Sequence, residues 1–527
     1  MKARRALLAA LLAIAGIAHA ERQTVCTVTV NSPDERDVFR RHLPEGRYEF
    51  VELVERGNPD WLGASCRRGV RCDVLLVSGH FAGTEFYSSR HTVDETLPVD
   101  VLERAACSES CPGLFEGLKE VYLFGCDTLN PAPVRVTTPE MVRALQREGA
   151  TPDAAARAAR ELAERHGESA LDHMRRLFAG VPVIYGFSSK APYGRYAGPV
   201  LARHLQSGGA EEVGSGTMSD RLRRTFAPAS MVVAAGLAGH ERNADYRAEV
   251  CGYHDTRLTA AQKLAGIHAM LSRSMAEARL SLDRVEKFLA ELGPEERARP
   301  DFAAAMAAIA SDDPVRGRFL HLARDTPDPA VRLRLIALGR NLGWLTPPQE
   351  RDEIVAMVGE LLASRASGFH EVELVCTLNR DGGLDGRVAR PGKEIGTAAA
   401  HATLACLGHA ESRSRALEAL VSPDESEVQV AASYLRHRPL AGADELRAVA
   451  AKVTRMGNVA AQARALEALA RQHVTDEFVL VELAGLYERT RSPAVRSAIA
   501  EVYLRAGIPF SGTPRAPSST RAPARSG

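Results

Sequence analysis

The chain of 527 residues has few aromatic side chains and almost no net charge. Phe, Trp and Tyr make up 5% of it, which disfavours an all-β sandwich and favours packing of small side chains between helices. Lys and Arg number 67 against 66 Asp and Glu, so the chain as a whole has no net attraction for a phosphate backbone. We therefore expect no nucleic-acid partner.

Long apolar segments are also absent from the sequence after its first twenty residues, so we expect no transmembrane segment in the mature chain. A basic start is followed by an apolar stretch over residues 6–18, shorter than the roughly 20 residues of a spanning helix. Ala18-His19-Ala20 then fits the small-x-small pattern of signal peptidase sites. The pattern predicts a signal peptide over residues 1–20 and an exported protein, periplasmic or secreted.

Nine cysteines in an exported chain indicate disulfides, and the odd number leaves at least one thiol free or paired between chains. Sequence spacing favours three local pairs, which are Cys66 with Cys72, Cys107 with Cys111, and Cys376 with Cys406. The cysteines that remain are Cys26, Cys126 and Cys251. Because none of these spacings is that of a zinc site, we expect no metal, and no other cofactor is indicated.

Residues 21–205 alternate between strand and helix patterns. Strands are predicted at 25–30, 48–54, 73–79, 120–125 and 181–188. The runs 73–79 and 120–125 are near-continuously apolar, as is typical of strands buried on both faces. Helices are predicted between them at 33–42, 99–106, 138–148, 152–166 and 168–178. This alternation predicts an α/β domain with a mostly parallel sheet and helices on both faces.

The rest of the chain divides into three parts. Residues 206–258 are Gly-rich at first and show no clear periodicity, which predicts a linker or a loop-rich insertion. Residues 259–508 have a helical pattern throughout, which predicts an all-α domain. Residues 509–527 form a Pro/Ser/Arg tail with little to bury, and we expect it to be disordered.

Proline recurs at predicted helix starts in the all-α region. The breaks are Asp328-Pro329, Ser422-Pro423 and Ser492-Pro493. Alignment of Val428, Val459 and Val495 gives separations of 31 and 36, a period proper to solenoids of helical hairpins. The Pro-Ala-Val-Arg phrase resembles HEAT repeats, which implies a surface for a substrate or a protein partner.

Two of the predicted strands end in residues with catalytic chemistry. The run 73–79 is followed by His80, and the run 120–125 is followed by Cys126. Parallel neighbours would bring both residues to the edge where open α/β sheets build their sites. A histidine can take the proton of a nearby thiol, and the thiolate is the form that attacks. The backbone N–H groups of Phe81 and Cys126 are candidates to stabilise an oxyanion.

This arrangement resembles the caspase-like cysteine peptidases, which include caspases, gingipains and legumains. The segments that carry the resemblance are Leu75-Leu76-Val77-Ser78-Gly79-His80 and Val121-Tyr122-Leu123-Phe124-Gly125-Cys126, in that order. The resemblance covers residues 22–205 and implies that His80 is the general base, Cys126 the nucleophile, and a protein or peptide the substrate. One departure is Phe81, which stands where the family usually has Gly.

The resemblance also implies that the segment after the run 181–188 helps to line the pocket for the residue before the cut. The candidates there are Ser188, Ser189 and Lys190. Lys190 and Arg195 would favour an acidic substrate residue, and the alternative is that both are solvated loop charges.

Asp127, next to the candidate nucleophile, has two interpretations. It either binds a basic substrate group or caps the following turn. For the whole chain, two functions stay open. One is an exported caspase-like cysteine endopeptidase whose helical repeats bind substrate or a partner. The other is a non-catalytic HEAT-repeat scaffold with a degenerate caspase-like domain.

Overall fold

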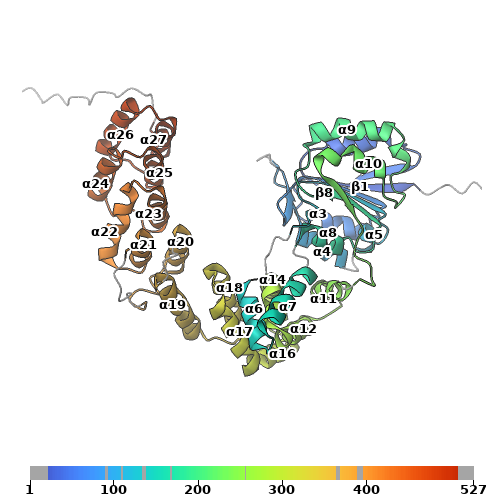
Figure 1. Ribbon diagram of the computed structural model, residues 1–527, viewed down its shortest axis with the longest axis horizontal. Coiled ribbons are helices and arrows are strands. Elements are labelled where there is room, and N and C mark those ends of the chain that lie inside the picture. The colour runs from blue at the N-terminus through green and yellow to red at the C-terminus, as the bar shows by residue number, and fades with distance from the viewer. Residues whose placement is uncertain are drawn as a thin grey trace, which may run out of the picture. The chain divides into compact units, whose positions relative to one another are not determined.

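The computed structural model describes residues 22–88, 93–107, 111–132, 138–166, 169–241, 243–255, 257–363, 368–388 and 396–508. The predicted signal peptide and the predicted disordered tail lie outside these residues. The chain forms two compact units, Met1–Asp325 and Thr326–Gly527 (Figure 1).

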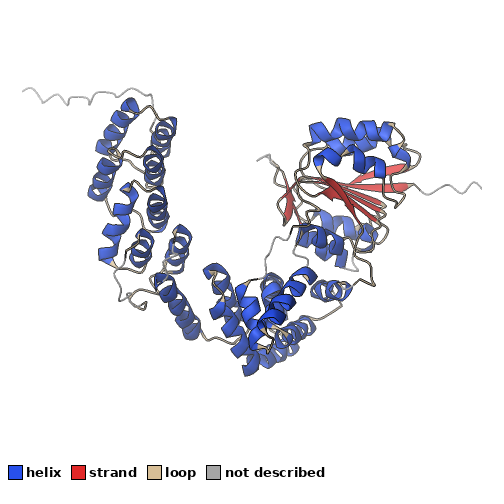
Figure 2. Ribbon diagram, in the orientation of Figure 1, coloured by secondary structure: helices blue, strands red, loops and turns tan. Residues whose placement is uncertain are grey.

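A six-stranded sheet forms the centre of the first unit (Figure 2). Its order is β2 (Tyr48–Glu52), β1 (Gln23–Thr29), β3 (Val74–Ser78), β7 (Glu120–Phe124), β8 (Val183–Phe187) and β9 (Met231–Ala234). The first five run parallel, and β9 pairs antiparallel with β8. Every residue of β3, β7 and β8 is buried, as their apolar runs predict. The prediction of an α/β fold with a mostly parallel sheet is confirmed.

Helices cover both faces of this sheet (Figure 1). One face carries α2 (Asp34–His42), α9 (Gly194–Gln206) and α10 (Asp220–Thr225). The other carries α3 (Trp61–Arg67), α4 (Val99–Cys107), α5 (Pro112–Phe115) and α8 (Ala170–Leu177). Successive strand residues serve opposite cores, since Leu76 packs with the first group of helices and Leu75 and Val77 with the second.

The segment 206–258, predicted as a linker or a loop-rich insertion, contains regular elements that the sequence analysis did not predict. It contributes η1 (Gly209–Glu211), α10, η2 (Ala227–Ala229), β9 and α11 (Ala244–His254). Strand β9 has only four residues, and its hydrogen-bonding partner β8 lies more than forty residues earlier in the chain. A window of sequence shows no sign of such a distant partner, so the sixth strand was missed. A second small sheet of β4 (His80–Phe81), β5 (Glu85–Tyr87) and β6 (Leu97–Pro98) was missed as well.

A group of helices completes the first unit. Helices α6 (Pro139–Arg147) and α7 (Pro152–Arg165), which fall between β7 and β8 in the chain, pack with α13 (Met275–Leu280). Apolar contact of Met141 with Ala276 and Leu280 joins these distant segments. The other members are α12 (Ala260–Arg273), α14 (Leu282–Glu291), α15 (Pro294–Arg297), α16 (Pro300–Ala310) and α17 (Asp313–Asp325). The first compact unit therefore extends to residue 325, well into the predicted all-α domain.

The second unit is helical within its described residues. Its elements are α18 (Pro329–Asn341), α19 (Pro347–Ala363), α20 (Phe369–Leu378), α21 (Ala398–Cys406), α22 (Ala410–Glu418), η3 (Ala419–Val421), α23 (Glu425–His437), α24 (Ala443–Val453), α25 (Val459–Ala470), α26 (Glu477–Arg489) and α27 (Pro493–Arg505). Helix α25 packs against α23 and α27, and α24 packs against α26, so alternate helices form two rows (Figure 1). One apolar cluster runs from Met357 to Tyr503 between them.

Regular caps mark the row of α23, α25 and α27. Asp424, Asn458 and Ser492 each accept backbone N–H groups of the first turn with a side-chain oxygen. These caps are spaced 34 residues apart, whereas the valine alignment gives 31 and 36. The alignment failed at Val459, which is 50% exposed, while Ala461 occupies the buried position.

Four disulfides stabilise the chain. They are Cys26–Cys72, Cys66–Cys111, Cys107–Cys251 and Cys376–Cys406. The last was predicted and is confirmed, whereas the local pairs Cys66–Cys72 and Cys107–Cys111 are wrong. Neighbouring strands bring the first pair together, and helix packing brings the second and third together, over 45 or more residues of chain. Disulfides in this number fit an extracellular or periplasmic protein.

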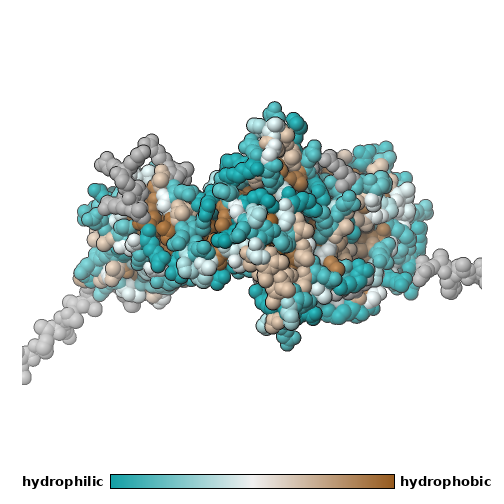
Figure 3. All heavy atoms as spheres, turned by 90° about the horizontal axis from the view of Figure 1, so that it is seen from below, coloured by the Kyte–Doolittle hydropathy of each residue, from teal (hydrophilic) through white to brown (hydrophobic). Residues whose placement is uncertain are grey.

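On the face drawn in Figure 3, hydrophilic residues predominate and hydrophobic residues form smaller patches between them. Among the helices that the structure describes, none is long and apolar enough to cross a membrane.

Candidate active site

A cavity of about 280 Å³ lies at the carboxyl ends of β1, β3, β7 and β8. Each strand is followed by residues that line it, namely Asn31 and Glu35, Gly79 and His80, Gly125 and Cys126, and Lys190 and Tyr193. Strand β2 lies on one side of β1 and β3 on the other, so the chain changes direction across the sheet at this point. Open α/β sheets bind ligands at such a switch point.

Two glycines allow the ends of β3 and β7 to come together. A Cβ atom on Gly125 would lie 2.9 Å from the carbonyl oxygen of Gly79, closer than real side chains come to backbone. Glycine at 125 therefore lets the segment that carries Cys126 pack against the segment that carries His80.

Cys126 is the cysteine outside the four disulfides, and it is half-buried. Its Sγ atom accepts a hydrogen bond from the backbone N–H of Ala191 at 3.3 Å. This contact holds the sulfur beside the segment that follows β8. Cys126 is therefore the thiol that the odd number of cysteines leaves without a disulfide within the chain.

His80 lines the same cavity as Cys126. Its ring lies between Tyr87 and Tyr193, with centroid distances of 5.5 and 6.0 Å. In the described part of the chain no hydrogen bond joins His80 to Cys126. Such bonds are often long in enzymes without substrate, so their absence is compatible with acid–base chemistry. The structure thus places both predicted residues in one cavity.

The backbone N–H of Phe81 donates no hydrogen bond to the neighbouring strand β5. The N–H of Ala82 donates to the carbonyl of Glu85 at 3.1 Å, so the next pair along the ladder, Phe81 with Phe86, is of the non-hydrogen-bonded kind. The Phe81 ring packs on Phe86 with centroids 4.7 Å apart, away from the cavity lining. Cys126 N–H likewise has no acceptor among the described residues.

The predicted substrate-pocket residues have different positions. Lys190 lines the cavity. The hydroxyls of Ser188 and Ser189 instead contact Ser230, at 3.3 Å from its carbonyl oxygen and 2.8 Å from its hydroxyl. The Arg195 guanidinium lies 4.7 Å from the centre of the exposed Tyr196 ring, outside the cavity lining.

Asp127 has the geometry of a turn residue. Its φ angle is 58°, in the left-handed region that aspartate tolerates. The side-chain Oδ1 accepts a hydrogen bond from Asn130 at 2.8 Å, and the backbone N–H donates to Ser189 at 2.7 Å. Asp127 therefore stabilises the turn after Cys126, which is the second of its two interpretations.

Glu35 is a cavity residue that the sequence analysis missed. It is 2% exposed, and Ser78 Oγ donates to its carboxyl group at 2.9 Å. Burial raises the pKa of Glu35 to about 7, well above the ordinary value of a glutamate. The available signal was its helical spacing from Val38 and Phe39, which puts all three on the buried face of α2.

We expect Glu35→Gln to remove a pH dependence of stability. Because the folded protein binds this proton more tightly than the unfolded chain does, the free energy of unfolding of the wild type falls as pH rises from about 4.5 to 7. The fall amounts to about 3 kcal/mol. Urea unfolding at pH 4.5 and pH 8 measures it. The exposed Glu45→Gln variant should keep the wild-type slope, and equal slopes in all three proteins would contradict the prediction.

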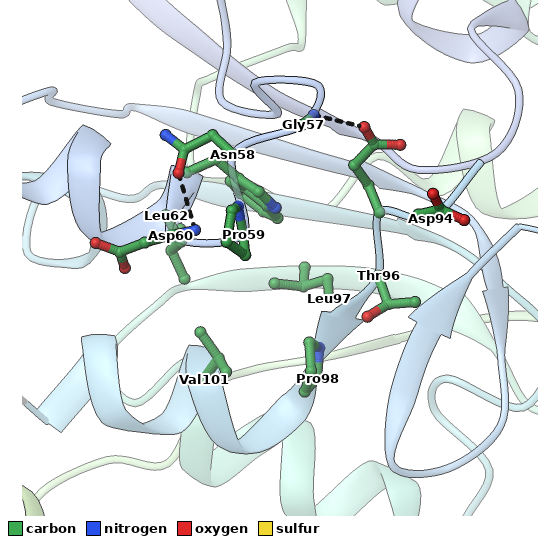
Figure 4. A pocket seen from close by; sticks show the side chains of 12 residues that line it. Gly57, Asn58, Pro59, Asp60, Leu62, Asp94, Thr96, Leu97, Pro98 and Val101 are labelled. Carbon is green, nitrogen blue, oxygen red and sulfur yellow. Dashed lines mark hydrogen bonds between the residues drawn. The ribbon is translucent and has the colours of Figure 1, made fainter.

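A larger cavity, of about 420 Å³, lies between residues 57–62, which include the start of α3, and residues 94–101 (Figure 4). Apolar side chains such as Leu97 and Val101 lie opposite carboxylates of the loops. Glu95 is already paired with Arg56 at 2.7 Å and with the N–H of Gly57 at 3.1 Å. Neither cysteine nor histidine lines this cavity, so the nucleophile chemistry belongs to the cavity at the switch point.

Comparison with known proteins adds no relatives. No family model, no curated protein and no solved structure matches the chain. Within the described residues, no group of three or more His, Cys, Asp or Glu side chains could hold a metal ion. The site is thus defined by its own geometry, as a free thiol and an imidazole at the switch point of a parallel sheet.

Proposed function

We propose that this protein is an exported cysteine endopeptidase with Cys126 as nucleophile and His80 as general base. The observation that carries the proposal is the position of Cys126. Eight cysteines form disulfides, and the ninth lies half-buried in the switch-point cavity together with His80. A thiol kept out of disulfides and placed in one cavity with an imidazole is suited to nucleophilic catalysis.

In the proposed reaction, His80 accepts the thiol proton and Cys126 Sγ attacks the carbonyl carbon of the scissile peptide bond. The N–H groups of Cys126 and Phe81 donate to the oxyanion. When the C–N bond breaks, the leaving amine takes the proton from His80, and a thioester remains on Cys126. Water then attacks the thioester with His80 as base, which releases the acid and restores the thiol.

Topology supports the caspase-like part of this proposal. The histidine precedes the cysteine in the chain, and they follow the adjacent parallel strands β3 and β7. Phe81 stands where caspase-like peptidases usually have Gly. Its ring packs on Phe86, and the proposed oxyanion role needs only its backbone N–H.

For the second unit we propose a solenoid of helical hairpins that binds substrate or a protein partner. The support is the two rows of helices and the caps at 34-residue spacing. HEAT repeats are about 40–47 residues long, so the HEAT-like assignment depends on the Pro-Ala-Val-Arg phrase alone.

A non-catalytic scaffold is the second candidate. It is favoured by the contacts of His80, whose ring lies between Tyr87 and Tyr193 without a hydrogen bond to Cys126 among the described residues. In that case the α/β domain would support the helical unit without performing chemistry.

Labelling with an iodoacetamide probe, without reductant, separates the two candidates. If His80 activates the thiol, Cys126 is alkylated in the wild type, and His80→Ala slows that alkylation by about tenfold or more. Mass spectrometry identifies the labelled residue. The exposed His240→Ala variant is the matched control and should label at the wild-type rate. Slow labelling that is indifferent to His80 would favour the scaffold.

A further inference from the structure

Another cavity, of about 300 Å³, lies among helices α11, α12, α13 and α14 of the first unit. Its lining includes the rings of Tyr246 and Tyr253 and the apolar side chains of Ile267 and Met270. Leu258, which is 37% exposed, also lines it. Concave sites with mostly apolar walls and a few polar groups are typical of small-molecule binding.

One wall of this cavity carries a guanidinium group. Arg284 lines the cavity with 22% of its side-chain surface exposed, and it donates to the hydroxyl of Tyr246 at 2.5 Å. The nearest carboxylate is that of Glu103, at 3.8 Å. Glu103 also pairs with the buried Arg176 at 3.2 Å, so one carboxylate serves two guanidinium groups.

A third guanidinium group adds to the positive charge behind the cavity. Arg247 donates to the backbone carbonyls of Arg176 and Ala106, at 3.1 and 3.2 Å. In the described part of the chain no carboxylate lies within ion-pair distance of Arg247, and burial lowers the pKa of its guanidinium. Among the described residues, Glu103 is thus within ion-pair distance of Arg176 and Arg284, and Arg247 pairs only with backbone carbonyls.

Two acidic groups line the cavity, Glu249 and Glu277, and both are already paired with arginines. Glu249 lies 3.4 Å from both Arg165 and Arg273. Glu277 pairs with Arg273 at 3.0 Å and faces His166 at 3.9 Å. Lys263 also lines the cavity, and no described carboxylate lies within ion-pair distance of its ammonium group. A bound anion would pair with this ammonium group and with the guanidinium of Arg284.

We propose that this cavity binds a small amphipathic organic anion, with an aromatic body against the apolar walls and a carboxylate at Arg284. Guanidinium–carboxylate pairing is strong in such a setting because both hydrogen bonds are charge-assisted. The apolar walls exclude small hydrophilic anions as good ligands. The site is separate from the Cys126 cavity, so the proposal does not depend on peptidase activity.

Gly266 offers a variant that fills the cavity without disturbing its walls. It lies in α12 and lines the cavity, and a Cβ atom there would meet nothing within 4 Å. Gly266→Leu therefore places a side chain in open space and also favours the helix. Gly317 in α17 is equally unobstructed but lies outside the cavity lining, so Gly317→Leu is the matched control.

Calorimetric titration of the full-length mature protein with 2-naphthoate tests the proposal. We expect saturable binding to the wild type and to Gly317→Leu, and at least about tenfold weaker binding to Gly266→Leu. Absence of saturable binding to the wild type, or equal binding by both glycine variants, would overturn the assignment of the cavity.

The charge requirement has its own test. The uncharged 2-naphthamide should bind the wild type at least about tenfold more weakly than 2-naphthoate. Lys263→Gln, which alters only a half-buried side chain at the wall, should weaken naphthoate while leaving naphthamide unchanged. Equal affinities for the acid and its amide would overturn the anion assignment even if the cavity is the binding site.

Discussion

Cys126→Ser is expected to reduce peptide hydrolysis by about a thousandfold or more. A serine hydroxyl keeps the shape of the site but holds its proton far more tightly than a thiol, and a site built for a thiolate lacks the means to remove it. Mass spectrometry of a mixed peptide library, incubated with the purified mature protein, measures the cleavage. The same library identifies which residue precedes the cut.

Folding of the variant has to be shown independently. Because Cys126 takes part in no disulfide and accepts only one weak hydrogen bond, the thermal midpoint of Cys126→Ser should stay close to that of the wild type. Hydrolysis that survives in a folded Cys126→Ser protein would contradict the assignment of the nucleophile. If the wild type cleaves no peptide of the library, the scaffold function gains support.

Removal of the Cys26–Cys72 disulfide is expected to cost about 4 kcal/mol of stability in the first unit. The bridge closes a loop between cysteines 46 residues apart, and its loss restores the conformational freedom of that loop to the unfolded chain. Alanine at both positions avoids the burial of a hydroxyl, since neither cysteine is exposed by more than 2%. Hydrogen exchange followed by mass spectrometry measures the loss of protection from exchange in each strand.

The disulfide of the second unit provides the control. Replacement of both Cys376 and Cys406 by alanine should lower protection in α20 to α23 and leave β1 and β3 as in the wild type. The Cys26/Cys72 variant should show the reverse pattern. Uniform loss of protection in both variants would contradict an independent stabilising role for each bridge.

Much of the α/β fold was predictable because it depends on local patterns. Three strands, β3, β7 and β8, are buried along their whole length and mostly apolar, and such runs are recognisable without knowledge of their neighbours. Strand β9 is different. Its pattern is short, and its inclusion in the sheet depends on hydrogen bonds to β8. The helices α6 and α7 were predicted as helices, but their packing with α13 depends on apolar contacts across more than a hundred residues.

The candidate site was also predictable only in part from local sequence. Sequence alone placed His80 and Cys126 after two buried strands, and their shared cavity follows because parallel neighbours end at one edge. Glu35 was not predicted as a site residue, because acidic residues are common in the first turn of a helix. Only the structure shows that this one is buried. The role of Asp127 as a turn residue also became clear only from its backbone angle and its bond to Asn130.

By itself, the sequence determined the mostly parallel sheet, the helical second half, the presence of disulfides and the ends of the strands that carry His80 and Cys126. Apolar periodicity and residue chemistry are properties of short segments, so a single chain is sufficient to show them. Tertiary structure alone decided three of the four disulfide pairs, the sixth strand, the burial of Glu35 and the cluster of guanidinium groups behind the α11–α14 cavity. Each of these depends on which distant segments become neighbours, and packing of the whole chain sets that choice.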